Sequence, residues 1–296
     1  MLRRAFIAAF LLLFVCALPS AAQDGGESLR ERDQRLLDAT FATLAPQQPG
    51  RTDLYVVGFA GDGAEDVFRN EVDYLETLMA QRFAAKGRIV SLVNHVDSFR
   101  TPRPLATLAN LRQALAGLGK VMDRDEDVLL LFLTTHGTPD HRLYLQLPPV
   151  FEATITPRQL RAALDASGIR HRVVVVSACY SGGFIPKLRS PDTLVLAAAR
   201  KNRPSFGCGS DSAATYFGRA WMVDGLNHTT DFIAAFESAR LRIAAREKAE
   251  DFPPSQPQID IGEHIAARLQ QWQAGFTPGP AVPYPYADKA SDAAAP

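Results

Sequence analysis

The chain is poor in cysteine and carries no net charge, and both absences restrict its class. Only three of its 296 residues are cysteine, which is too few for a small disulfide-stapled scaffold. Its 32 basic and 32 acidic residues balance and form no dense basic cluster, so we expect no nucleic-acid partner. The histidines lack paired-ligand spacing, and no glycine loop has P-loop or Rossmann spacing. We therefore expect neither a bound metal nor a cofactor.

The apolar run at the N-terminus, residues 5–17, is short for a membrane span. Arg3 and Arg4 precede it, and Ser20-Ala21-Ala22 follows it with the small residues of a cleavage site. This order is typical of a secretory signal. We expect residues 1–22 to be a cleaved signal peptide and the protein to be secreted or periplasmic, without a stable membrane span after cleavage. An uncleaved anchor is the alternative.

The remaining chain alternates apolar strand-like segments with helical segments whose apolar residues recur every three or four positions. The clearest expected strands are residues 53–59, 88–93, 128–133, 173–176 and 192–199, and the clearest expected helices are 68–83, 105–118, 157–167 and 231–249. Such alternation predicts an α/β fold with a mostly parallel central sheet and helices on both faces. We expect a single domain over residues 51–275.

Two flanking segments are expected outside that domain. Residues 23–50 are polar and predict a short helix and linker, and residues 276–296 are rich in proline and alanine without periodicity. The second composition predicts a disordered tail.

A cysteine follows the most hydrophobic of these strands. Four consecutive valines, Val173 to Val176, predict a strand that is buried on both faces. The strand stops at Ser177-Ala178-Cys179, and Gly182-Gly183 permits a tight turn. The thiol of Cys179 is therefore expected at the carboxyl edge of the sheet, where open α/β folds bind ligands.

A histidine follows a second apolar strand, because residues 128–133 lead into Thr134-Thr135-His136-Gly137. A thiol becomes a useful nucleophile when a base or a cation lies beside it, and His136 could supply both. Two less reactive alternatives stay open at this point. His136 could be structural, and Cys179 could form a disulfide with Cys208 in an oxidising compartment.

Several segments of the chain resemble the legumain and glycosylphosphatidylinositol transamidase family of cysteine peptidases. A strand ending in His-Gly and a later strand ending in Ala-Cys-x-Ser-Gly are similar to that family's active-site segments. Phe68-Arg69-Asn70-Glu71-Val72-Asp73 resembles its Tyr-Arg-His-Gln-Ala-Asp, and Thr215-Tyr216-Phe217-Gly218 resembles its Thr-Tyr-Leu-Gly. The resemblance spans about residues 52 to 225 and implies a caspase-like three-layer sandwich.

The resemblance implies a cysteine endopeptidase that acts on a peptide or protein substrate through a thioester. Cys179 would be the nucleophile, His136 the general base and acid, and the N–H groups of Gly137 and Cys179 the oxyanion hole. The alternatives are an inactive peptide-binding relative and a transpeptidase or transamidase. The family's asparagine at the end of the first strand has no counterpart in Gly58-Phe59-Ala60-Gly61, so another group must orient His136.

The same resemblance implies a specificity pocket formed by Arg69, Ser177 and Asp211. Arg69 matches the family's basic pocket residue, Asp211 lies near the position of its acid, and Ser177 stands where the family has a glutamate. Loss of that carboxylate leaves the pocket more positive, so we expect Asn or Asp at P1, the residue before the cleaved bond. Cys208 is expected to pack against the pocket wall, with a free reactive thiol as the alternative.

Overall fold

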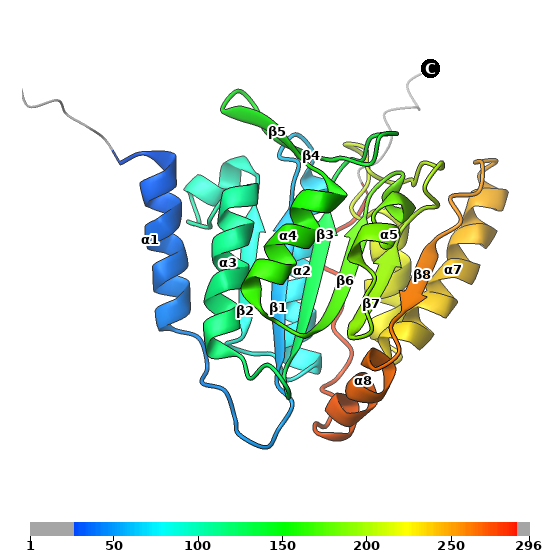
Figure 1. Ribbon diagram of the computed structural model, residues 1–296. Coiled ribbons are helices and arrows are strands. Elements are labelled where there is room, and N and C mark those ends of the chain that lie inside the picture. The colour runs from blue at the N-terminus through cyan, green and yellow to red at the C-terminus, as the bar shows by residue number, and fades with distance from the viewer. Residues whose placement is uncertain (1–26, 289–296) are drawn as a thin grey trace, which may run out of the picture.

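The computed structural model describes residues 27–288 and contains a six-stranded sheet in the spatial order β2-β1-β3-β6-β7-β8 (Figure 1). Five strands are parallel to their neighbours, and only β8 is antiparallel. The strands are β1 (Leu54–Ala60), β2 (Ile89–Val93), β3 (Val128–Thr134), β6 (His171–Ser177), β7 (Thr193–Ala197) and β8 (Gln258–Ile261). The predicted mostly parallel sheet is confirmed.

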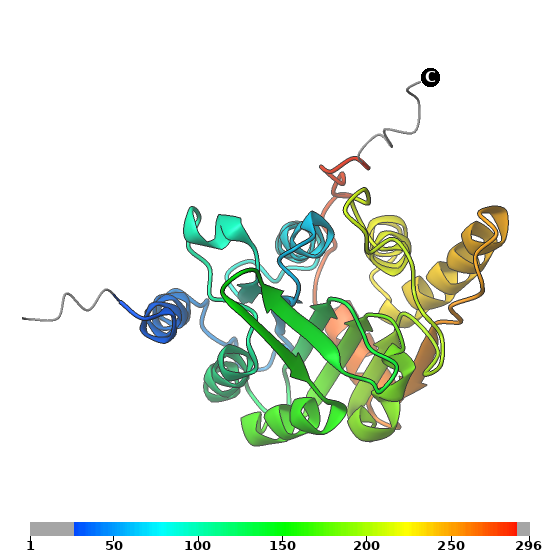
Figure 2. The same ribbon diagram turned by 90° about the horizontal axis from the view of Figure 1, so that it is seen from above.

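Helices cover both faces of the sheet, as the view from above shows (Figure 2). One layer contains α3 (Leu108–Val121), α4 (Pro157–Ser167) and the short α5 (Ile185–Leu188), and the other contains α2 (Asp66–Arg82), α6 (Tyr216–Gly218), the π-helix η3 (Arg219–Leu226) and α7 (Phe232–Ala249). Helix α8 (Ile265–Ala274) lies at the opposite end of the sheet from the hairpin of β4 (Leu143–Leu147) and β5 (Phe151–Ile155) (Figure 1). The expected α/β three-layer sandwich is thereby confirmed.

The sandwich has two apolar cores because alternate strand residues point to opposite faces. Val56 and Phe132 pack with α2, η3 and α7, whereas Val57 and Leu131 pack with α3 and α4. Every residue of β1, β3, β6 and β7 is buried. This two-sided burial explains why the strands are continuous apolar runs without polar alternation.

The carboxyl ends of the strands carry the remaining small elements. A hairpin of β4 (Leu143–Leu147) and β5 (Phe151–Ile155) projects above β3 (Figure 1). Two short 3₁₀ helices, η1 (Val96–Phe99) and η2 (Ser181–Gly183), follow β2 and β6. These elements and the loops between them surround one edge of the sheet.

The helix expected outside the core, α1 (Leu29–Ala42), is instead packed onto α3. Leu37 is fully buried against that layer. Asp33 is 3% exposed and accepts a hydrogen bond from Nδ2 of Asn110 at 2.6 Å. Helix formation in the polar segment is favoured by a capping box between Ser28 and Glu31. The segment from residue 27 to 50 therefore belongs to the domain.

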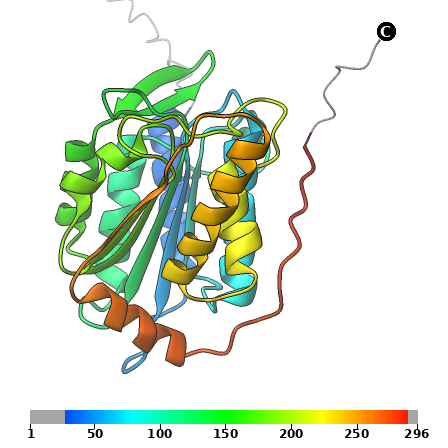
Figure 3. The same cartoon turned by 90° about the vertical axis from the view of Figure 1, so that its right-hand side faces the viewer.

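The expected disordered tail is a packed extended segment as far as residue 288 (Figure 3). Val282 is 4% exposed, its N–H donates to Oδ1 of Asn227, and its carbonyl accepts from the hydroxyl of Tyr74. Prolines favour an extended chain, and a few apolar anchors suffice to hold it. Composition suggested disorder because these anchors are isolated and have no period.

The expected signal peptide, residues 1–22, lies outside the described residues. Within residues 27–288 no helix has both the length and the apolar character that crossing a bilayer requires.

Candidate active site

The two strands that carry His136 and Cys179 are neighbours, and they end at the same edge of the sheet. Strands β3 and β6 pair in parallel up to Thr134 opposite Ser177. His136 and Cys179 each follow two residues after that last pair. Equal offsets on adjacent parallel strands bring an imidazole and a thiol to adjacent places, as the sequence predicted.

The turn after β6 holds Cys179 on a constrained backbone. Tyr180 has a φ of 56°, which is the left-handed conformation, and its N–H donates to the carbonyl of Arg203 at 2.9 Å. Gly182 donates its N–H to Ala199 at 2.8 Å. These bonds tie the turn to the loop after β7, so the thiol sits on a positioned segment.

Gly137 packs directly on the backbone of Cys179. A Cβ at position 137 would collide with the carbonyl oxygen of Cys179, so only glycine fits there. The N–H of Gly137 and the N–H of Cys179 donate no hydrogen bond to another residue within 27–288. Two unused donors therefore lie beside the thiol.

The thiol of Cys179 is partly buried and surrounded by donors. The N–H of Ser205 lies 3.3 Å from Sγ, and its hydroxyl lies 3.7 Å away. A hydrogen bond from the Cys208 thiol, followed by those from Ser205 and by the charge of His136, lowers the pKa of Cys179 to about 6. Part of the Cys179 population is thus thiolate in mildly acidic to neutral solution.

Cys208 is a free thiol in this structure, as is Cys179. It packs against a small apolar cluster that contains Phe68 and Val72. The nearby thiolate of Cys179 raises the pKa of Cys208, so Cys208 stays protonated and acts as the donor of the pair.

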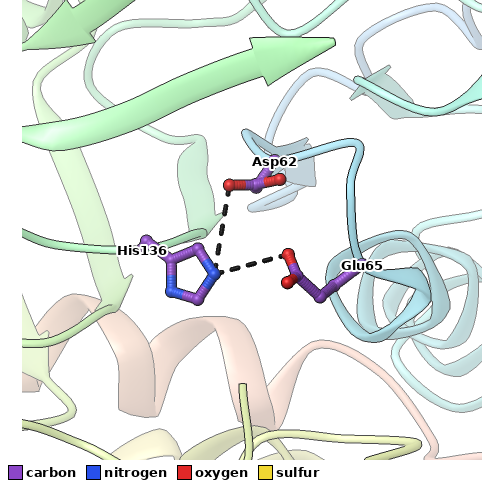
Figure 4. Close-up of side chains that lie close together, drawn as sticks. All are labelled: Asp62, Glu65 and His136. Atoms are coloured by element: carbon purple, nitrogen blue, oxygen red, sulfur yellow. Dashed lines mark hydrogen bonds and ion pairs between the residues drawn. The ribbon is translucent and has the colours of Figure 1, made fainter. Parts of the chain in front are cut away.

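His136 is oriented by two carboxylates that sequence reasoning missed (Figure 4). Its Nε2 lies 3.4 Å from Oε2 of Glu65 and 4.0 Å from Oδ2 of Asp62. The ring of Phe68 contacts the imidazole edge-on, with centroids 5.1 Å apart. Asp62 follows directly after Gly61, at the edge of the sheet where β1 ends, so its place in the chain was the available signal.

The two carboxylates are held differently. Asp62 is fully buried, and its oxygens accept from Nε2 of Gln146 at 2.9 and 2.8 Å and from the N–H of Ala64 at 2.9 Å. Glu65 is the residue before α2, and its side chain is 23% exposed. Together with His136 these side chains place three ligand atoms within 4.8 Å of one another, the geometry of a metal-binding group.

Arg69 lies one helical turn after Glu65 and is already ion-paired. Its guanidinium lies 3.3 Å from Asp66 and 3.4 Å from Asp97, and it stacks on the ring of Tyr286 at 5.9 Å. Its buried Nε has no hydrogen-bond partner among the described residues. Arg69 therefore lies one turn along α2 from the carboxylate that contacts His136, but Asp66 and Asp97 largely compensate its positive charge.

The other two residues expected in the pocket lie in different surroundings. Ser177 is 2% exposed, and its hydroxyl lies 3.3 Å from that of Thr215. Thr215 in turn donates from its N–H and its hydroxyl to the fully buried Glu71, at 2.8 and 2.6 Å. Asp211 is exposed on the loop after β7, and no ion pair joins it to Arg69 in residues 27–288.

Glu71 is a buried carboxyl group that the sequence did not single out. Its second oxygen accepts from the hydroxyl of Thr134, so it connects α2, β3 and the Thr215-Tyr216-Phe217-Gly218 segment. Burial raises the pKa of Glu71 above its usual value. The segment that carries the family resemblance around Arg69 is thus anchored to the end of the strand that precedes His136.

A comparison with protein families identifies the family of the chain. The model of the peptidase C13 family matches residues 104–267, which include His136 and Cys179 but not Arg69. No curated protein matched the chain. Among solved structures, caspase-1 from Spodoptera frugiperda is 15% identical with a TM-score of 0.48, over 74% of this chain and 93% of that one. The family match covers more than half of the chain, and the chain therefore belongs to the peptidase C13 family, the legumain family of cysteine-type peptidases.

Proposed function

We propose that this protein is an endopeptidase that cleaves peptide bonds through a thioester on Cys179. One observation carries the proposal. Cys179 and His136 each follow two residues after the last paired residues of adjacent strands, beside two backbone N–H groups that have no acceptor among residues 27–288.

The proposed reaction follows from the surroundings of each group. His136 takes the thiol proton, and the thiolate attacks the carbonyl carbon of the substrate. The N–H groups of Gly137 and Cys179 donate to the resulting oxyanion. Protonated His136 then gives its proton to the leaving amine, and water, deprotonated by His136, hydrolyses the thioester.

Glu65 and Asp62 replace the family's missing asparagine in this proposal. Their carboxylates face Nε2 of His136, so they hold the ring and stabilise the imidazolium that forms when the thiol gives up its proton. Two negative groups provide more charge stabilisation than a neutral amide does. The chain thus has a substitute for the orienting residue that its sequence lacks.

For the substrate we propose Asn or Asp at P1, held by Arg69. The support is the resemblance of the Arg69 segment, the Nε of Arg69, which has no hydrogen-bond partner within residues 27–288, and the position of Arg69 one turn from Glu65. Asp66 and Asp97 already compensate most of the Arg69 charge, which favours a neutral amide more than the sequence alone suggested. We also propose export by the N-terminal signal, which N-terminal sequencing of the exported protein would test.

The proposal is tested with Cys179→Ala and His136→Ala, a mixed peptide library and intact-mass labelling by peptidyl electrophiles. We expect one covalent adduct in wild type, none in Cys179→Ala, and loss of cleavage in both variants. Thermal unfolding controls for folding. Cleavage that persists in a folded Cys179→Ala protein would exclude this nucleophile.

Two related functions give different results in the same assay. A transamidase forms the same adduct but joins the acyl group to an added amine in preference to water. An inactive peptide-binding relative binds the electrophile's peptide portion without any gain in mass.

A further inference from the structure

The group formed by Asp62, Glu65 and His136 contains two carboxylates, whereas one acceptor is enough to orient an imidazole. Both carboxylates have His136 as their one ion-pair partner in the described part of the chain, and neither contacts a lysine or an arginine. Asp62 is fully buried, where a carboxylate without a full positive partner is costly. Two negative charges and one imidazole therefore converge on a small volume that favours a cation.

We propose that Asp62, Glu65 and His136 form a binding site for a divalent transition metal such as Zn²⁺, which reversibly blocks the peptidase by occupying Nε2 of His136. The inhibition of peptidase activity rests on the proposed function. Metal binding does not, because it depends only on the three side chains.

The distances suit zinc after a small adjustment. Two ligand atoms, each about 2.1 Å from a tetrahedral Zn²⁺, lie about 3.4 Å apart. The separation between Nε2 of His136 and Oε2 of Glu65 is 3.4 Å, and that between Nε2 and Oδ2 of Asp62 is 4.0 Å. The wider separation can close by a fraction of an ångström through the imidazole of His136, whose side chain is 34% exposed, while the buried Asp62 stays in place.

The surroundings of Asp62 also resemble those of a built metal ligand. Gln146 donates to both of its oxygens and Ala64 donates to one, which fixes the carboxylate toward His136. Such hydrogen bonds orient the ligands of metal sites and increase the affinity of the site for the metal. The imidazole ligand favours zinc and its neighbours in the first transition series over calcium and magnesium, which prefer oxygen alone.

The partial exposure of His136 leaves room for further ligands. Its side chain is 34% exposed, so water can complete a four-coordinate zinc. A metal on Nε2 adds positive charge to the ring and makes it a poor acceptor for the thiol proton of Cys179. Bound metal would thus stop the proposed reaction before the first step, without a change in the fold.

The binding arm of the test uses untagged Cys179→Ala protein, residues 23–296, in calorimetric titration with ZnCl₂. This background removes the thiolate as a competing ligand. We expect one Zn²⁺ per chain, and a loss of affinity of about tenfold or more when Glu65→Gln or Asp62→Asn is added. Glu263→Gln is the control, because Glu263 lies beside His264 in an exposed acid–histidine pair elsewhere. We expect it to leave the affinity unchanged.

A spectroscopic arm separates two ligand sets that calorimetry alone could confuse. Co²⁺ in place of Zn²⁺ should give the visible bands of a nitrogen and oxygen site in wild type, without a thiolate-to-cobalt charge-transfer band. A charge-transfer band, or binding that disappears in Cys179→Ala but survives Glu65→Gln, would assign the metal to the thiolate and overturn the proposal.

The inhibition arm tests the consequence for catalysis. Zn²⁺ should inhibit wild type reversibly, and a chelator should restore activity. The Zn²⁺ concentration that halves the rate of the uninhibited enzyme should be at least about tenfold higher for Glu65→Gln than for wild type. Binding without peptidase activity would refute the proposed function and leave the site standing. If wild type is active but the Cys179→Ala protein binds no Zn²⁺, the metal site is refuted and the proposed function stands.

Discussion

Glu65 is the residue directly before helix α2, and its Oε2 lies 3.4 Å from Nε2 of His136. A carboxylate in that place can both aim the imidazole and stabilise its positive charge. The fully buried Asp62, 4.0 Å from the same nitrogen, supports the pair from the turn after β1. Two carboxylates from the connection between β1 and α2 thus face one ring nitrogen.

We expect Glu65→Gln to lower kcat/KM about tenfold, which corresponds to about 1.4 kcal/mol of transition-state stabilisation. The amide keeps the shape but loses the negative charge. Glu65→Ala should cost more, because it removes the orienting contact as well. Steady-state kinetics with one peptide substrate measure both effects.

Glu76→Gln is the matched control, since it removes a carboxylate from an exposed position of the same helix. It should leave kcat/KM unchanged. Equal activity of wild type, Glu65→Gln and Glu65→Ala would show that His136 needs no carboxylate partner.

Cys208 provides a test of the thiol environment. Its hydrogen bond is the largest cause that lowers the pKa of Cys179 to about 6, so its removal should raise that pKa. In Cys208→Ala the midpoint of iodoacetamide labelling against pH should move above 6, and labelling at pH 6 should slow several-fold. Cys208→Ser keeps a donor and should lie between the two. An unchanged midpoint in Cys208→Ala would mean that Ser205 and His136 set the ionisation alone.

Glu71 should affect stability in a manner that depends on pH. Burial raises its pKa in the folded protein, so its carboxyl contributes most below the pKa of the unfolded chain and loses that contribution as pH rises through the folded pKa. Glu71→Gln mimics the protonated form, and the family segment has Gln at this place. We expect Glu71→Gln to unfold at the same temperature as wild type in acid, and at a higher temperature than wild type in alkali.

Glu71→Ala is the contrasting variant, because it leaves the donors of Thr215 and Thr134 without an acceptor. Each buried donor that is left without an acceptor costs about 1–3 kcal/mol, so the free energy of unfolding should fall by about 3 kcal/mol or more. Calorimetric or denaturant unfolding at two pH values distinguishes these outcomes. Destabilisation by Glu71→Gln at alkaline pH would contradict a raised pKa.

The sheet and the places of His136 and Cys179 could be predicted because they depend on local signals. Four consecutive valines predict a strand buried on both faces, and a Gly-Gly turn after a cysteine predicts where it ends. Parallel pairing then brings the ends of β3 and β6 together without further information.

The orienting carboxylates and the packed tail could not be predicted in the same way. Asp62 and Glu65 are more than seventy residues from His136, and only the crossover from β1 through α2 brings them to its ring. The tail depends on isolated anchors such as Val282, whose partners Tyr74 and Asn227 are distant in sequence. Long-range contacts of single residues have no periodic signal, so composition alone suggested a linker and a tail.

Selectivity at P1 is the sharpest test of the Arg69 assignment. Arg69 is paired with Asp66 and Asp97, so a substrate side chain must share its guanidinium with two carboxylates. An Asn side chain can accept from Arg69 and donate to a carboxylate, whereas an Asp side chain only accepts and is repelled by both. We expect wild type to prefer Asn over Asp at neutral pH, and both over Lys and Arg.

The measurement is kcat/KM for matched substrates with Asn, Asp, Lys and Arg at P1, in wild type, Arg69→Gln and Arg100→Gln. Arg100 is the control because it is 82% exposed and also lies near Asp97, at 3.7 Å. Arg69→Gln should reduce the preference for Asn about tenfold, since it leaves Asp66 and Asp97 without their shared cation. Arg100→Gln should leave the ranking intact. If wild type prefers Lys or Arg, or if the two variants behave alike, Arg69 does not form the pocket, whatever the fate of Cys179 and His136.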